Sequence, residues 1–167
     1  MPFAQDLPEQ SHHLANREPR RPRQASLRRA VSTAYYALFH LLIQEATRNW
    51  RKAPQRALLA RAFEHGRMRT AGDKKRMDLN RFMRQSPPPA AKQRAVAQHL
   101  HTVVTTFIQA QEQRHTADYD NSKQGTRTEV LTQIANVMTA FESWHEIRDE
   151  ELAQDYLVYL LIRERGR

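Results

Sequence analysis

Two short segments combine side chains that can do chemistry. The first, Arg114 to Tyr119 (Arg-His-Thr-Ala-Asp-Tyr), offers a cation, an imidazole, a carboxylate and a phenol at the predicted junction between two helices. The second, Arg28 to His40, carries paired tyrosines followed by Phe-His in a helix that is predicted to be buried. A simpler interpretation is that the buried tyrosines and the histidine only satisfy hydrogen bonds, and that Arg114 pairs with Asp118 at the end of its helix.

The sequence contains few side chains whose spacing suits a metal site. His99 and His101 are two residues apart, which on a helix directs them roughly 200° apart. Asp118 and Asp120 could hold a magnesium ion through oxygen ligands, but two carboxylates in a polar loop more often form a turn and a helix cap. We therefore expect no metal and no cofactor.

Composition excludes several classes of reaction. The absence of cysteine removes disulfide frameworks, thiolate zinc sites and cysteine nucleophiles. The four glycines stand alone, so the sequence contains neither a G-x-G-x-x-G turn nor a phosphate-cradling loop. It also lacks a serine-hydrolase elbow and an H-E-x-x-H zinc helix.

The elements that must position the reactive segments are predicted to be helices. From Leu27 to Glu45 the apolar residues follow a 3.6-residue period over much of the helix circumference, which is typical of a central bundle helix. Residues 101–108 are β-branched, yet their apolar spacing is helical, and three prolines at 87–89 suit a helix start. Thr126 and Glu129 form a capping box that opens a further helix.

These signals predict an all-α fold. The expected helices cover residues 27–45, 54–66 with Gly66 as the stop, a segment from 90 onward, a segment from 126 onward, and 149–164. The last of them begins with acidic residues and ends near Arg163 and Arg165, charges that suit the two ends of a helix dipole. The sequence predicts a bundle of about five or six helices. Neither proline nor glycine separates the last two, so one long kinked helix is an open alternative.

The charge is strongly positive and has two main sources. The chain has 27 Lys and Arg against 18 Asp and Glu, a net charge of +9. Residues 17–30 and the expected long connection at 67–84 are the basic stretches, which predicts a polyanionic partner such as RNA. The alternative is an ordinary solvated surface. The predicted RNA-binding residues are Arg20, Arg21, Arg23, Lys74, Lys75 and Arg76.

The two reactive segments resemble motifs of the HEPN superfamily, in particular its small stand-alone bacterial and archaeal members. The motifs read Ala34-Tyr-Tyr-Ala-Leu-Phe-His40 and Arg114-His-Thr-Ala-Asp-Tyr119. The resemblance covers about residues 10–145 of a single domain spanning 1–167. It implies an up-down antiparallel four-helix core, here followed by an additional C-terminal helix at about 149–165. It also implies a homodimer and a cytoplasmic role in toxin–antitoxin or phage-defence systems.

The resemblance also implies a catalytic site. Many relatives are metal-independent ribonucleases that place an arginine and, after four to six intervening residues, a histidine from each subunit across the dimer axis. Such cleavage needs a base for the ribose 2′-hydroxyl and a cation for the developing phosphorane charge. Arg114 matches the cation and Asp118 belongs to the same motif, but Tyr119 stands where the histidine is expected. A phenol with a reference pKa near 10 is a poor base at neutral pH, so His115 or His40 would have to substitute.

A literal arginine–histidine pair with the family's spacing, Arg94 and His99, does occur in the sequence, but it lies in mid-helix. Positions five apart diverge there by about 140°, so we interpret this match as coincidence.

Three classes of function are compatible with the sequence. The first is a cytoplasmic RNA-directed protein of toxin–antitoxin or defence type that acts as a weak or degenerate metal-independent endoribonuclease. The second is a non-catalytic module that binds RNA or a nucleotide. The third is an interaction subunit that partners a small nucleotidyltransferase.

Two further expectations concern assembly and location. The C-terminal segment carries an apolar face that a lone four-helix core would leave exposed, which favours a homodimer with Arg114 near its axis. This face consists of Leu152, Tyr156, Leu157, Leu160 and Leu161. The longest apolar run, residues 34–43, is too short to span a bilayer, and the N-terminus has no charged-then-apolar leader. We therefore expect a cytoplasmic protein without a membrane partner.

Overall fold

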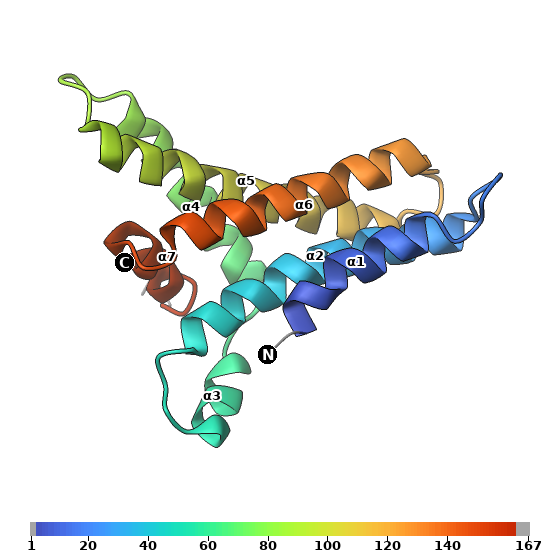
Figure 1. The fold of residues 1–167 in the computed structure, drawn as a ribbon, viewed down its shortest axis with the longest axis horizontal. Helices are drawn as coiled ribbons and strands as arrows, with labels where there is room; N and C mark the ends of the chain where they lie inside the picture. Colours follow the sequence, from blue (N-terminus) through green and yellow to red (C-terminus); the bar gives the residue numbers. More distant parts are fainter. Residues whose placement is uncertain (1–2, 163–167) are drawn as a thin grey trace. The chain divides into compact units, whose positions relative to one another are not determined.

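The computed structural model describes residues 3–162. Seven α-helices make up the secondary structure of this described part, and it contains no strand (Figure 1). They are α1 (Phe3–Ala15), α2 (Gln24–Thr47), α3 (Ala53–Ala60), α4 (His65–Met83), α5 (Ala91–Tyr119), α6 (Arg127–Ile147) and α7 (Glu151–Tyr159). The predicted all-α class is confirmed, with more helices than the five or six expected.

The chain divides into two compact units. Unit 1 contains Met1–Leu41 and Thr106–Glu142, and unit 2 contains Leu42–Thr105 and Ser143–Arg167. The boundary cuts through α2, α5 and α6, so each unit is built from segments that are distant in the sequence. A single domain over 1–167 stays a prediction.

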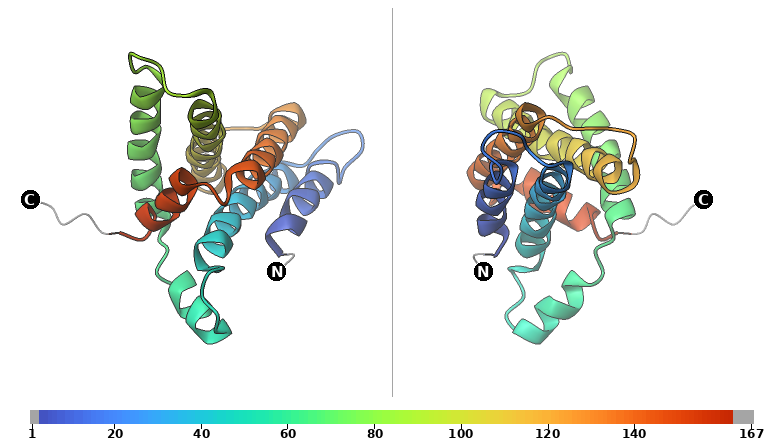
Figure 2. Two further views of the ribbon diagram at one scale, coloured as in Figure 1. Left: turned by 60° about the vertical axis from the view of Figure 1, so that its left-hand side comes forward. Right: turned by 90° about the vertical axis from the view of Figure 1, so that its right-hand side faces the viewer.

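Unit 1 consists of α1, α2 as far as Leu41, α5 from Thr106 onward and α6 as far as Glu142. Figure 2 shows α1 running alongside the first part of α2, where the buried Ser11 hydroxyl donates to the Ala30 carbonyl over 2.7 Å. The core of the unit contains Tyr35 from α2, whose ring lies 5.7 Å from that of Phe107 on α5. The predicted capping box is confirmed, because the Thr126 backbone amide donates to Glu129 Oε2 over 2.7 Å and the Glu129 amide donates back to Thr126 Oγ1 over 3.2 Å.

Unit 2 contains the end of α2, all of α3, α4 and α7, the start of α5 and the end of α6. Its largest buried side chains include Met68, Leu100, Trp144 and Tyr156. The strand alternative for residues 101–108 is excluded, because α5 is one continuous helix from 91 to 119. Short α3 begins with a proline in its first turn, as its sequence predicts, but none of its residues is buried.

The prediction of a long connection at 67–84 is wrong, since this basic stretch forms helix α4. Met68, Gly72 and Leu79 form a buried stripe at helical spacing, which the excess of charged residues hides in the sequence. Asp73 also accepts from Arg76 over 3.0 Å, a pair three residues apart that supports a helix. Gly66 therefore lies in the first turn of α4 and does not end the preceding helix, which stops at Ala60.

The last two helices are separate. Between them, the Arg148 side chain donates to Glu45 on α2 with Nη2–Oε1 2.6 Å and Nε–Oε2 3.2 Å, and its carbonyl accepts from Gln154. Glu45 is buried and also lies 3.6 Å from Arg48. These contacts stabilise a break where no proline or glycine marks one.

Helix α7 is shorter than the expected 149–165. Its charged end, Arg163 and Arg165, lies outside the described residues. Tyr156, Leu157 and Leu160 are at most 3% exposed, so the apolar face that was expected to need a second subunit is largely covered within the chain. No described helix is both long and apolar enough to cross a membrane.

Candidate functional site

Arg114, near the end of α5, is the centre of a polar cluster in unit 1. Its Nε donates to Asp118 Oδ2 over 2.8 Å, one helical turn later. The other carboxylate oxygen, Asp118 Oδ1, accepts from the Ser32 hydroxyl of α2 over 2.7 Å. The carboxylate therefore links the two helices, and the sequence interpretation that Arg114 pairs with Asp118 is confirmed.

Two tyrosine rings of α2 also contact Arg114. Its guanidinium carbon lies 5.6 Å from the ring centroid of Tyr35 and 5.4 Å from that of Tyr36, within the range of cation–π attraction. Burial raises the pKa of Tyr35 far above its ordinary value, and the positive charge of Arg114 opposes only part of that effect. Tyr35 therefore stays protonated and serves as a neutral platform for the arginine.

Arg114 keeps donors for a ligand. Its side chain is 20% exposed, and its two terminal nitrogens make no hydrogen bond to any other residue in the described part of the chain. A guanidinium that is fixed at Nε and open at its Nη groups can bind a phosphate oxygen pair in the planar geometry that arginine favours. The cluster is thus suited to hold an oxyanion.

His115 and Tyr119 lie beside each other on the exposed side of the end of α5. Their ring centroids are 4.9 Å apart, and Tyr119 is 68% exposed. Neither ring makes a hydrogen bond or a cation–π contact with the Arg114 guanidinium in the described residues. These two predicted catalytic residues therefore form an exposed aromatic pair next to the cluster, on the same turn of helix.

His40 lies in an aromatic group and not in the cluster. Its ring is 5.2 Å from that of Phe3 and 6.0 Å from that of Tyr36. Burial lowers the pKa of His40, so its imidazole is neutral near pH 7. Tyr36 contacts both His40 and Arg114, but the latter two make no direct contact with each other in the described residues. The proton-accepting role predicted for His40 has no support from this placement.

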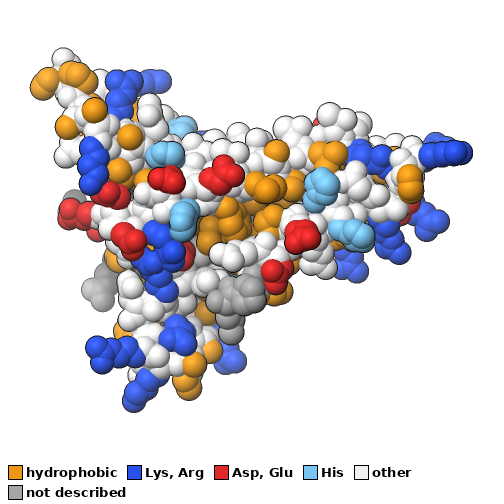
Figure 3. Space-filling view, in the orientation of Figure 1, with side chains coloured by type: hydrophobic (Ala, Val, Ile, Leu, Met, Phe, Trp, Pro, Cys, Tyr) orange, Lys and Arg blue, Asp and Glu red, His pale blue; other side chains and the backbone are white. Residues whose placement is uncertain are grey.

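The α1–α2 loop carries the first predicted RNA-binding group. Arg20, Arg21 and Arg23 are all exposed there, and Figure 3 shows Lys and Arg side chains gathered at the end of unit 1 that carries this loop. Arg127 of α6 fixes the backbone of the loop, because its guanidinium donates to the carbonyls of Ala15, Pro19 and Glu18. The exposed arginines therefore extend from an anchored backbone.

The second predicted group, on α4 in unit 2, is largely engaged within the protein. Lys75 lies 4.8 Å from the ring centroid of Tyr159, and burial lowers its pKa against the opposing charges of Asp155 and Asp78. Arg76 is paired with Asp73, while Lys74 is exposed.

The carboxylates considered for magnesium have other partners. Asp120 accepts from both the amide and the hydroxyl of Ser122, which makes it a turn residue, and Asp118 belongs to the arginine cluster. No group of three or more metal-ligating side chains occurs within residues 3–162. The alternative of a turn is thus observed for Asp120.

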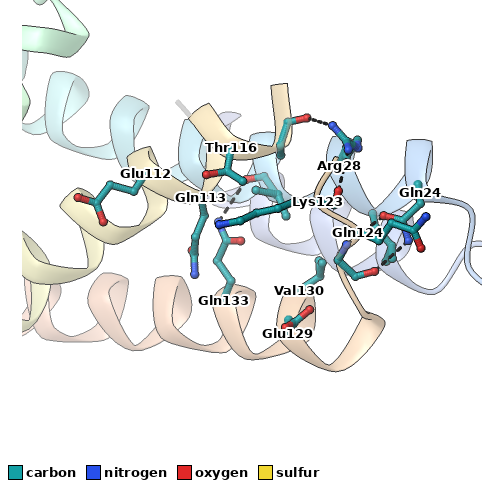
Figure 4. A pocket seen from close by; sticks show the side chains of 14 residues that line it. Gln24, Arg28, Glu112, Gln113, Thr116, Lys123, Gln124, Glu129, Val130 and Gln133 are labelled. Carbon is teal, nitrogen blue, oxygen red and sulfur yellow. Dashed lines mark hydrogen bonds between the residues drawn. The ribbon is translucent and has the colours of Figure 1, made fainter. Parts of the chain in front are cut away.

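A pocket that sequence reasoning did not find lies in unit 1, between α2, the end of α5, the α5–α6 loop and α6, and none of the cluster residues lines it (Figure 4). Arg28 forms one side of it and donates to the carbonyls of Ala117, Asp120 and Lys123. One signal was present in the sequence. Gln133 lies on the apolar stripe of α6 between Val130 and Val137, and a polar residue at a buried helical position often marks a site.

The site residues thus come from elements that are far apart in the sequence, and unit 1 brings most of them together. Arg114, Asp118 and the loop arginines share unit 1 with the pocket, whereas Lys74, Lys75 and Arg76 belong to unit 2.

Comparisons of the chain with protein-family models, with curated proteins and with solved structures gave no match.

Proposed function

We propose that the protein is a HEPN-like RNA-directed protein of toxin–antitoxin or defence type that binds single-stranded RNA through unit 1. The observation that carries the proposal is the state of Arg114, which is fixed by Asp118 and two tyrosine rings while its terminal nitrogens stay open. A preorganised guanidinium of this kind binds phosphate with little loss of side-chain entropy.

The loop arginines supply the attraction that a single phosphate contact lacks. Arg23 directly precedes α2, and Ser32, which bonds Asp118, lies eight residues after the first residue of that helix. At a rise of 1.5 Å per residue this is about 12 Å along the helix axis. One strand can therefore contact both the loop and the cluster, and most of its affinity comes from counterion release at the loop.

Catalysis by one chain has little support in this geometry. Arg114 can stabilise negative charge, but Tyr119 keeps a phenol where HEPN ribonucleases use a histidine, and the His115 ring makes no hydrogen bond to the Arg114 guanidinium in the described residues. We propose a binding protein whose ribonuclease activity is weak or lost.

The experiment is a charge reversal with a matched control. Binding of a fluorescein-labelled 12-nucleotide RNA is followed by anisotropy at several salt concentrations, for the wild type and for Arg20→Glu/Arg21→Glu/Arg23→Glu. The control, Arg51→Glu/Lys52→Glu/Arg61→Glu, makes the same charge change at exposed residues of unit 2.

We expect the loop variant to lose at least tenfold in affinity and to show a shallower salt dependence, since it neutralises fewer phosphates. The control should change affinity by less than threefold. Equal losses in both variants would mean that only net charge matters, and the proposed site would be wrong. Thermal melts check that both variants are folded.

A further inference from the structure

The pocket of unit 1 has a volume of about 340 Å³, at the small end of the range for ligand sites. Its apolar wall consists of Leu27 and Val31 from α2 and Val130 from α6. Polar side chains surround this wall, and four of them are glutamines: Gln24, Gln113, Gln124 and Gln133. Figure 4 shows these side chains coming from three helices and the α5–α6 loop.

Several polar groups of the pocket serve to build it. Gln24 makes two bonds with the backbone of Gly125, donating to its carbonyl over 2.9 Å and accepting from its amide over 3.0 Å. Arg28 is occupied by three carbonyls of the α5–α6 segment, and Glu129 by the capping box. The walls are therefore fixed before any ligand arrives.

Other polar groups are left for a ligand. The side-chain amides of Gln113 and Gln124 make no hydrogen bond within the described residues, and both side chains line the pocket. Gln133 is only 5% exposed, and its Nε2 donates to the Val31 carbonyl over 3.4 Å, which directs its amide toward the apolar wall. Lys123 adds a cation from the loop.

This lining selects a class of ligand. A phosphate inside the pocket is disfavoured by the carboxylates of Glu112 and Glu129, which also line it. A lipid chain would leave the amides unpaired, at a cost in free energy. A nucleobase combines a flat apolar face with an edge of donors and acceptors, and glutamine amides pair well with such an edge, best with the N6 and N7 of adenine.

We infer that this pocket takes one unstacked nucleobase of the bound RNA strand, with adenine preferred. The inference rests on the proposed function, because the base arrives as part of the strand held by the loop arginines and by Arg114. Gln24 follows Arg23 directly, and Ala117 lies one turn from Arg114 on α5. A strand whose phosphates bind at both positions can therefore turn a base into the pocket between them.

The test compares RNA octamers of a single base. Affinities for oligo-A, oligo-U and oligo-C are measured by anisotropy for the wild type and for Gln113→Leu/Gln124→Leu. Leucine keeps the approximate size of glutamine and removes its donors and acceptors. The control is Gln109→Leu, an exposed glutamine of α5 in unit 1 that does not line the pocket.

We expect the wild type to bind oligo-A about tenfold more tightly than oligo-U, the discrimination that one good amide–base pair supplies. The double variant should lose this preference and keep its salt dependence, and the control should keep both. Equal affinity of the wild type for all three octamers would overturn the base pocket and leave the proposed RNA binding intact. Failure of every octamer to bind would overturn the proposed function as well. Binding of free adenosine without any RNA binding would make the pocket a small-molecule site and refute the inference in this form.

Discussion

Replacing Asp118 by asparagine is expected to strengthen RNA binding, although it removes one partner of an ion pair. The carboxylate lies 2.8 Å from Nε of Arg114 and reduces the attraction of that guanidinium for a phosphate. Asparagine can keep both contacts, because its carbonyl can accept from Arg114 and its amide can donate to the Ser32 hydroxyl. The tyrosine rings still hold the arginine in place.

The size of the effect follows from Coulomb's law. A phosphate on the terminal nitrogens of Arg114 would be about 6 Å from the carboxylate charge, where the repulsion in water is about 0.7 kcal/mol, or roughly threefold in affinity. Salt screens this repulsion, since the Debye length is about 10 Å at 0.1 M ionic strength. We therefore expect about threefold tighter binding at low salt and almost none of this gain at 0.5 M.

The assay is anisotropy with the labelled 12-nucleotide RNA in 20 mM and 500 mM salt. Asp6→Asn is the matched control, because Asp6 is an exposed carboxylate of unit 1 and its loss changes the net charge equally. The substitution Asp118→Asn is also made in an Arg114→Ala background, where it should have no more effect than the control. Weaker binding by Asp118→Asn at low salt would refute the reasoning, because it would mean that the carboxylate acts mainly by positioning Arg114.

Four further predictions concern Tyr119 beside the cluster, the α5–α6 loop, the core of unit 2 and the pH dependence of stability. Tyr119→His supplies a base with a near-neutral pKa after Arg114 and is expected to raise RNA cleavage in EDTA, followed on denaturing gels. Arg28→Lys keeps the charge but replaces the two donating nitrogens, Nη1 and Nη2, by a single nitrogen, so the three carbonyls lose their matched donors and amide hydrogen exchange in the α5–α6 loop should rise. Glu45→Ala leaves Arg148 without its carboxylate and should lower the free energy of unfolding by about 2 kcal/mol in urea, since the arginine is partly exposed. Burial lowers the pKa of His40 in the folded protein, so the unfolded chain binds the proton more readily. The contribution of the neutral His40 to the free energy of unfolding is therefore fully present above pH about 6.5 and is lost as the pH decreases through the folded pKa.

Each of these expectations has an opposite result that can be recognised. If folded Tyr119→His that still binds RNA does not cleave it, the missing histidine is not what limits catalysis. Unchanged exchange in Arg28→Lys would show that the loop is held by other contacts, with Gln24 as the next candidate. If Glu45→Ala unfolds at the wild-type urea concentration, the ion pairs add nothing to stability. For His40, the same pH dependence of stability in His40→Phe would exclude this imidazole as its source.

Local signals in the sequence predicted local structure well. The capping box at Thr126 and Glu129 and the Arg114–Asp118 pair are both confirmed. Both could be predicted because the two partners lie within about one turn of the same helix. The apolar stripe from Leu27 to Glu45 predicted α2 to within a few residues at each end. Such features depend on the geometry of a single helix.

Features that depend on distant residues were not predicted. The carbonyl contacts of Arg28 and Arg127 join residues about 90 to 110 positions apart in the chain, and no spacing rule in one sequence indicates them. Helix α4 was hidden because its buried stripe is narrow and its other faces are charged. The pocket was missed because glutamine has no charge, and its role depends on which apolar wall it faces.

The contacts that hold Arg114 also determine what it can contribute. Its charge is partly neutralised by Asp118, so it adds little to the overall attraction of a polyanion, while its fixed orientation makes its terminal nitrogens selective for one phosphate position. The loop arginines differ from Arg114 in that their side chains are exposed and flexible. Their guanidinium groups therefore attract any phosphate, whatever its position. Affinity and strand register should therefore separate by mutation: charge reversal in the loop should change the salt slope, whereas Arg114→Ala should mainly reduce the preference for oligo-A, because a strand without its fixed phosphate no longer presents a base to the pocket. Footprinting of the bound octamer would measure that loss of register directly, and an unchanged footprint in Arg114→Ala would show that the loop alone sets the position of the strand.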